Sequence, residues 1–186
     1  DEQAQGFVGC AFCIVMSRRV PSSGLAGPGP RKGGGRAAAP TAAGILRKAQ
    51  NTIQAIPYGG RCTPTGPHPV TLVTVDSLGF ASARTVVPRE IASNLTSFRL
   101  NTRSTTRKVA EIQGNSKVSL NFQDHRGPGG WLTVKGNAKL SGVKRDGTVD
   151  ILVAPVSLSV VNFNEGDSVG CEPAMLMLGP QGWVVP

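Results

Sequence analysis

Acidic residues are almost missing from the first 75 positions of this 186-residue chain, which has none between Gln3 and Val75. Arg, Ser, Ala, Gly and Pro dominate there instead, and such a composition buries too little apolar surface to fold by itself. Arg-rich, Ser-rich and acid-poor leaders are typical of organelle transit peptides. We therefore expect residues 1–40 to be a disordered basic leader and transit peptide, with the chloroplast favoured over the mitochondrion or the cytoplasm. A disordered linker without a targeting role is the alternative interpretation.

Long apolar runs are absent from the sequence as well. The stretch Phe7–Met16 has ten residues, whereas a helix that spans a membrane needs roughly 18 or more. The residues before it are acidic, and a secretory signal peptide carries a basic flank there. We therefore expect neither a membrane anchor nor a secretory signal. Met16 followed by Ser-Arg-Arg is a more natural start, so residues 1–15 are expected to be absent from the native product or to be lost with the leader.

Cysteines are few and are not spaced for a metal site. Cys10 and Cys13 form one Cys-x-x-Cys pair, but Cys62 and Cys171 lie far apart in the sequence. A structural zinc site needs a second pair nearby, so we expect no metal. The same four residues do not form a disulfide framework, and they fit a reducing, intracellular compartment better.

Aromatic residues make up only 5% of the chain, and its positive charge is unevenly placed. Residues 1–75 hold eight basic and two acidic residues, whereas residues 76–186 hold twelve basic and nine acidic residues. A nucleic-acid-binding domain concentrates its cations on the folded part, together with a recognition helix or stacking aromatics. We therefore expect no nucleic-acid partner despite the net charge of +9.

Regular structure is expected to begin near Thr41. Apolar residues recur there with the helical period, which predicts an amphipathic helix. Thr41 can cap the start of this helix, and Pro57 enforces its end. The residues of the stripe are Ala42, Ile45, Leu46, Ala49, Ile53 and Ile56. A turn-rich loop follows up to Pro69, and we expect residues 41–186 to form a single domain.

Beyond Pro69 the pattern changes from helix to sheet. Val70–Val75 is β-branched, ends at a turn signal, and is followed by a hairpin partner at Phe80–Val87. One short helix is expected at about Thr105–Gln113. Further strands are expected at Leu95–Asn101, Lys117–Gln123, Trp131–Leu140 and Val156–Phe163. Many short antiparallel strands with a few helices predict a mainly β protein, a closed or partly closed β-barrel.

The segment Thr102–Lys108 carries the chemistry. Hydroxyls and cations converge there at the point where a strand ends and the short helix begins, next to the free N–H groups of the helix start. Arg can meet a phosphate with two parallel hydrogen bonds, and Lys adds a point charge. The segment therefore predicts a phosphate site. A solvated basic helix start is the alternative for these residues taken alone.

Five segments, in order and spacing, resemble the FMN-binding split-barrel family typified by pyridoxamine 5'-phosphate oxidase. The resemblance covers residues 65–140 well and the tail more loosely. The segments are Thr71-Leu-Val-Thr-Val-Asp76, Ala83-Arg-Thr-Val-Val87, Asn101-Thr-Arg-Ser-Thr-Thr-Arg-Lys108, Asn115-Ser-Lys-Val-Ser-Leu-Asn-Phe122 and Val134-Lys-Gly-Asn-Ala-Lys-Leu140.

The resemblance implies a split β-barrel that binds FMN at the interface of a homodimer. Arg84 would reach the flavin phosphate, and Thr106, Arg107 and Lys108 would match the Ser-Arg-Lys step of the family at the same group. The backbone of the strand from Arg84 to Arg89 would meet the ring edge. The full set of implied cofactor-binding residues is Arg84, Thr85, Val86, Val87, Arg89, Asn101, Thr102, Thr106, Arg107, Lys108 and Trp131.

Departures from the family pattern argue against oxidation of vitamin B6 itself. Trp131 stands where the oxidases proper carry a Gln, and Arg89 replaces a Lys that holds substrate phosphate there. The terminal Arg/His signature is missing too. His68 and His125 are isolated and look like loop residues, so the catalytic residues are not identified. A flavin enzyme tolerates this, because the isoalloxazine performs the electron transfer.

Three functions follow from this pattern. The first is an FMN-dependent oxidoreductase acting on an unidentified small molecule. The second is a non-catalytic flavin-binding or cofactor-free split barrel that serves as a regulatory or interaction module. The third, haem handling, lacks a convincing ligand His. Another phosphate-bearing flavin, such as a deazaflavin, remains an alternative to FMN.

Overall fold

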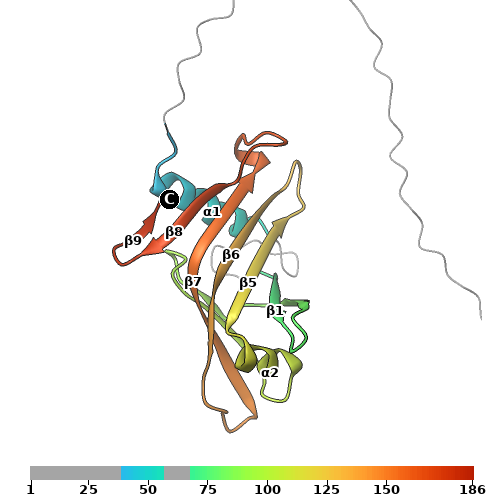
Figure 1. Ribbon diagram of the computed structural model, residues 1–186. Coiled ribbons are helices and arrows are strands. Elements are labelled where there is room, and N and C mark those ends of the chain that lie inside the picture. Colours follow the sequence, from blue (N-terminus) through green and yellow to red (C-terminus); the bar gives the residue numbers. More distant parts are fainter. Residues whose placement is uncertain (1–38, 57–67) are drawn as a thin grey trace, which may run out of the picture. The chain divides into compact units, whose positions relative to one another are not determined.

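The computed structural model describes residues 39–56 and 68–186 (Figure 1). The expected leader and its boundary at residue 40, the run Phe7–Met16, the cysteines Cys10, Cys13 and Cys62, and most of the loop 57–69 lie outside the described residues. The boundary of the folded domain therefore stays a prediction. In the part of the chain that is described, no helix has the length and apolar character needed to cross a membrane.

Helix α1 (Ala42–Gln54) forms where the apolar stripe predicts it. The Thr41 hydroxyl accepts a hydrogen bond from the Gly44 N–H at 3.2 Å, which caps the first turn. Ile45, Ala49 and Ile53 of the stripe are buried. The helix packs with this face on strands β5 to β9 and so closes one side of the hydrophobic core.

A single antiparallel sheet of nine strands makes up most of the described chain. The main path runs in the order β2-β1-β5-β6-β7-β4-β3, and β8 and β9 extend it from β7 as a terminal hairpin. The sheet does not close by hydrogen bonds between its outermost strands, β2 and β3. This partly open, mainly β architecture agrees with the expected fold class. The strands are β1 (Val70–Val75), β2 (Ala81–Val86), β3 (Glu90–Ile91), β4 (Phe98–Arg103), β5 (Lys117–Asp124), β6 (Gly130–Leu140), β7 (Thr148–Asn162), β8 (Ala174–Gly179) and β9 (Gly182–Val184).

The core lies on one face of the sheet because buried and accessible residues alternate along the strands. Leu72 of β1 pairs with Leu120 of β5, which pairs with Val134 of β6, and all three side chains are fully buried. Phe98 and Phe122 meet in the same core with ring centroids 6.0 Å apart. Helix α2 (Arg107–Gly114) packs against β1 and β6 and buries Val109 and Ile112.

Strand β7 is longer than the expected segment Val156–Phe163. Its first half carries Asp150 and Pro155, which weaken the strand signal in the sequence. Pro155 is tolerated because it lies opposite Gly136, where the register between β6 and β7 shifts in a bulge. A Cβ atom on Gly136 would lie 2.5 Å from the Ala154 carbonyl oxygen, so only glycine permits this close approach.

Candidate functional site

The expected phosphate site centres on Arg84 of β2. Arg84 pairs with Leu72 in the β1–β2 hairpin, so its side chain lies on the core-facing side of the sheet, beneath α2. The guanidinium donates to the Thr74 hydroxyl and, through Nη2, to the Glu111 carboxylate at 2.8 Å. The side chain of Arg84 is 23% exposed. A cation is therefore held at the edge of the barrel rather than free in solvent.

Glu111 of α2 is the buried acid of this cluster, with 7% of its side chain exposed. Oε2 accepts a hydrogen bond from the Thr74 hydroxyl at 2.5 Å in addition to the one from Arg84. The hydrogen bond from Thr74 and the interaction with the Arg84 guanidinium hold the pKa of Glu111 below its usual value, against the effect of burial. The residue is therefore a carboxylate at neutral pH.

Lys108 lies at the start of α2 and faces β4. Its ammonium group donates to the Thr102 hydroxyl at 3.1 Å, and this hydroxyl lies 3.3 Å from the hydroxyl of Thr106. Burial lowers the pKa of Lys108, and the nearby Arg84 guanidinium lowers it further, whereas Glu111 raises it. Lys108 has no carboxylate within ion-pair distance among the described residues. A desolvated ammonium of this kind favours an anion as its partner.

Arg107 completes the cluster on the solvent side. Its side chain is 84% exposed, and Nε lies 3.7 Å from Oε1 of Glu111, one helical turn away. Thr106 precedes it at the N-cap position without capping the helix through its side chain, because its hydroxyl donates to the Arg103 carbonyl at 2.9 Å. The Val109 N–H donates to the Thr106 carbonyl at 2.9 Å, and the N–H groups that precede it at the start of a helix have no acceptor within the helix.

The cluster as a whole carries three cations and one carboxylate, a formal charge of about +2 at neutral pH. We call these residues the anion site: Thr74, Arg84, Thr102, Thr106, Arg107, Lys108 and Glu111. Guanidinium, ammonium, hydroxyl and helix N–H donors are the groups that bind phosphate. The donor set therefore fits the phosphate of a phosphorylated cofactor. Five of its members, from β2, β4 and α2, were expected from the sequence.

Several other expected site residues lie apart from these five. Thr85 alternates with Arg84 and lies on the opposite face of β2, where it pairs with Thr71. Val86 is half-buried and packs on the core. Strand β2 ends there, so Val87 and Arg89 follow the strand, and the Arg89 N–H donates to the Arg99 carbonyl at 2.7 Å.

Asn101 and Trp131 lie on the outward face of the sheet. Asn101 alternates with Thr102 along β4, and its amide donates to Asp150 at 2.8 Å. Trp131 alternates with the buried Leu132 and pairs with Gln123 and Val161. No hydrogen bond or ion pair between described residues joins either side chain to the anion site. A role for them at a flavin ring stays a prediction.

Glu111 and Thr74 were missed as site residues. The sequence did carry a signal for Glu111, which is the one acidic residue between Glu90 and Asp124 and follows Arg107 by four positions on a helix. The sequence carried no such signal for Thr74, because its position two residues after Leu72 only marks it as a core-facing strand residue. Thr74 contacts Glu111 only because α2 packs on β1.

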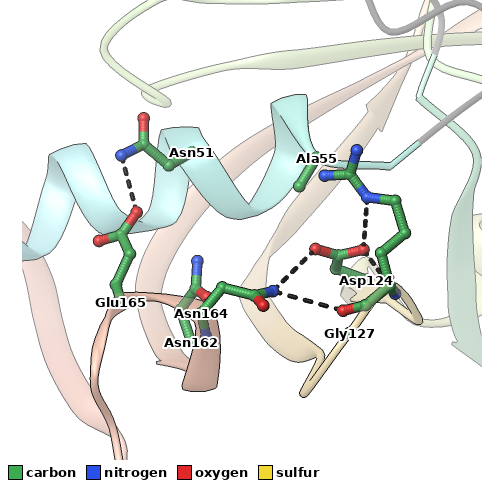
Figure 2. A pocket seen from close by; sticks show the side chains of 8 residues that line it. Asn51, Ala55, Asp124, Gly127, Asn162, Asn164 and Glu165 are labelled. Carbon is green, nitrogen blue, oxygen red and sulfur yellow. Dashed lines mark hydrogen bonds and ion pairs between the residues drawn. The ribbon is translucent and has the colours of Figure 1, made fainter.

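A separate polar pocket of about 320 Å³ lies between α1, the β5–β6 turn and the end of β7 (Figure 2). Its side chains bond with one another: Asn51 donates to Glu165 at 2.7 Å, and Asn164 donates to Asp124 at 3.4 Å. None of the site residues expected from the sequence lines this pocket. We assign no ligand to it, because these polar side chains already bond to one another.

Comparison with known proteins agrees with the fold. The family model described as pyridoxamine 5'-phosphate oxidase matches residues 61–157, just over half of the chain. This range contains β1 to β6, α2 and the whole anion site. No curated protein matches the chain significantly.

Three solved structures share the fold at low sequence identity. A pyridoxamine 5'-phosphate oxidase-related, FMN-binding protein from Nostoc punctiforme is 13% identical, covers 77% of this chain and 92% of its own, and has a TM-score of 0.52. General Stress Protein 26 from Bacillus anthracis is 14% identical, with 72% and 98% covered and a TM-score of 0.51. PhzG from Burkholderia lata, in complex with tetrahydrophenazine-1-carboxylic acid, is 13% identical, with 64% and 81% covered and a TM-score of 0.50.

The family match covers more than half of the chain, and the open antiparallel sheet agrees with it. The chain belongs to the pyridoxamine 5'-phosphate oxidase family of split barrels.

Proposed function

We propose that the protein binds FMN and acts as a flavin-dependent oxidoreductase on a small molecule. The observation that carries this proposal is the anion site, in which three cations, Arg84, Arg107 and the partly desolvated Lys108, lie together with a single carboxylate. A phosphate monoester carries a charge of roughly −1.5 to −2 at neutral pH. The site has the matching charge and the matching donors.

The proposed roles of the residues follow from their positions. Lys108, with Thr102 and Thr106, would hold the phosphate at the start of α2, and Arg107 would cover it from the solvent side. Arg84 would add its remaining N–H groups, because Thr74 and Glu111 engage only part of the guanidinium. The bound flavin would supply the electron transfer, while the protein positions it and excludes water.

A regulatory or interaction module without catalysis is the second candidate. One observation favours it: Arg84 already has an internal partner in Glu111, so the site is partly neutralised by the protein itself. Trp131, in place of the Gln of the oxidases, points the same way.

We also propose that the protein is a homodimer with the flavin at the interface. Several large apolar side chains are exposed on the outward faces of β7, β8 and β9, among them Val156, Met175, Met177 and Val184. Met177 pairs with Ser157 on one side and Val184 on the other, so Met177 and Val184 lie on one continuous surface. Exposed apolar surfaces of this kind mark sites of association.

Flavin titration of the purified protein tests the binding proposal. We expect quenching of FMN fluorescence and no comparable quenching of riboflavin, which lacks the phosphate. The double variant Arg107→Ala plus Lys108→Ala should lose this binding. Lys139→Ala plus Arg145→Ala removes the same charge from exposed positions and should retain it. A protein that binds neither FMN nor a deazaflavin phosphate would leave the cofactor-free module as the function.

A further inference from the structure

Glu111 places a negative charge inside a site built for anions. Its carboxylate contacts the Arg84 guanidinium at 2.8 Å and lies 3.7 Å from Nε of Arg107, and its own burial exceeds that of both cations. Three positively charged groups this close together repel one another without an anion between them. The carboxylate therefore lowers the energy of the folded protein when no external anion is present.

The same carboxylate opposes the binding of an external anion. A phosphate at Lys108 and Arg84 would lie near Glu111, and like charges in a partly desolvated site repel strongly. Glu111 also takes one of the N–H groups with which Arg84 could contact the phosphate. Glu111 therefore raises the stability of the free protein and lowers its affinity for the anion.

We propose that Glu111 is the internal counter-ion of the anion site: it neutralises Arg84 while the site lacks phosphate and competes with the phosphate for that guanidinium. Glu111 is thereby a positioning residue that limits the affinity for phosphate in exchange for stability of the free protein. The inference rests on the proposed function only in using the same phosphate-binding residues, and it does not require a flavin.

The charges near Glu111 determine how its removal changes the stability of the free protein and the affinity for phosphate. Arg84 faces Glu111 from β2, and Arg107 and Lys108 lie near it on α2, whereas β1 and β4 contribute only the neutral hydroxyls of Thr74 and Thr102 to the anion site. Removing the carboxylate leaves the partly buried Arg84 guanidinium without an acidic partner among the described residues. The free protein then loses stability, and the site gains attraction for an anion.

Thermal unfolding in chloride and in inorganic phosphate at equal ionic strength tests the proposal. In chloride, Glu111→Gln should lower the Tm by roughly 5 °C or more. In phosphate, its Tm should rise more than that of the wild-type protein, with an affinity for phosphate roughly threefold to tenfold higher. Glu111→Asp keeps the charge and should show a phosphate response close to that of the wild type, whatever its stability.

Asp167→Asn is the matched control. Asp167 forms an ion pair with Lys48 at 2.6 Å between α1 and the segment after β7, and neither residue shares a hydrogen bond or ion pair with the residues of the anion site. Its removal should lower the Tm without enlarging the phosphate response. A phosphate response of Glu111→Gln that equals or falls below that of the wild type overturns the proposal, because a merely structural residue would lose stability and affinity together.

The proposal that the protein binds FMN and the proposal that Glu111 is the counter-ion can be contradicted separately. If inorganic phosphate behaves as expected but FMN binds no more tightly than phosphate, the counter-ion stands and the flavin function falls. If FMN binds tightly to the wild type while inorganic phosphate raises the Tm of Glu111→Gln no more than that of the wild type, the flavin function stands and the counter-ion is wrong.

Discussion

The carboxylate of Glu111 lies 2.8 Å from the guanidinium of Arg84, although 27 positions separate the two residues in the sequence. The contact joins α2 to the β1–β2 hairpin and gives the anion site its one negative charge. Because the contact involves a carboxylate, part of the stability of the protein depends on pH. The stability of the packing between α2 and the β1–β2 hairpin also depends on whether the anion site is occupied.

Acid should remove the contribution of Glu111 to stability. Its pKa is lower in the folded protein than the ordinary value of 4.5, because Thr74 donates to the carboxylate and Arg84 attracts it. A depressed carboxyl pKa stabilises the fold above the unfolded-state pKa, and this stabilisation is lost as the pH falls through the folded-state value. Urea unfolding of the wild type and of Glu111→Gln should show a difference that is constant above pH 4.5 and shrinks below it. A difference that persists unchanged in acid would contradict this assignment.

Replacement of Lys108 should separate binding from folding. Lys108→Met removes a partly desolvated ammonium that has no acidic partner within ion-pair distance among the described residues, so the free energy of unfolding should stay unchanged or rise slightly. Affinity for FMN should fall by about tenfold to a hundredfold, the value of a hydrogen bond to a charged group. Lys139→Met, at an exposed position, makes the same change of charge and should alter neither quantity. Calorimetric titration and urea unfolding measure the two effects, and a large loss of stability in Lys108→Met would show that the residue is structural.

Gly136 should tolerate no side chain. Its Cβ position lies 2.5 Å from the Ala154 carbonyl oxygen and 3.0 Å from the Pro155 Cα, so Gly136→Ala must displace β7 at the bulge. Overpacking of this kind costs about 1–3 kcal/mol. Gly142→Ala, where no atom lies within 4 Å of the new Cβ, is the control and should have little effect. Equal midpoints of urea unfolding for the two variants would refute the close approach of β6 and β7.

The proposed dimer should dissociate when its apolar surface is charged. Met177→Glu introduces a carboxylate among Met175, Val156 and Val184, and burial of that charge in an interface would cost several kcal/mol. Sedimentation velocity should give a dimer for the wild type and a monomer for the variant. Val169→Glu, at a side chain that is 93% exposed, should remain a dimer. A wild-type protein that sediments as a monomer would rule out a flavin shared between subunits.

Local patterns predicted most of the secondary structure. The helical stripe with Thr41 and Pro57 predicted α1, and β-branched alternation predicted β1, β2, β5 and β6 with bounds close to those observed. The first half of β7 was missed, because Pro155 is compatible with a strand only where a bulge and Gly136 lie opposite it. Strands β8 and β9 were not predicted as a hairpin, since β8 (AMLMLG) has no β-branched or aromatic residue and β9 has only three residues.

The sequence by itself determined the local part of the anion site: Thr102 to Lys108 concentrates hydroxyls and cations at a helix start, where short-range geometry leaves N–H groups free. The tertiary structure decided which distant residues join them. Only the packing of α2 on β1 and the register of the β1–β2 hairpin bring Thr74, Arg84 and Glu111 together. Alternation along β4 separates Asn101 from Thr102, because adjacent strand residues face opposite sides. Charge balance is a property of groups close in space, so it depends on the fold that brings them together.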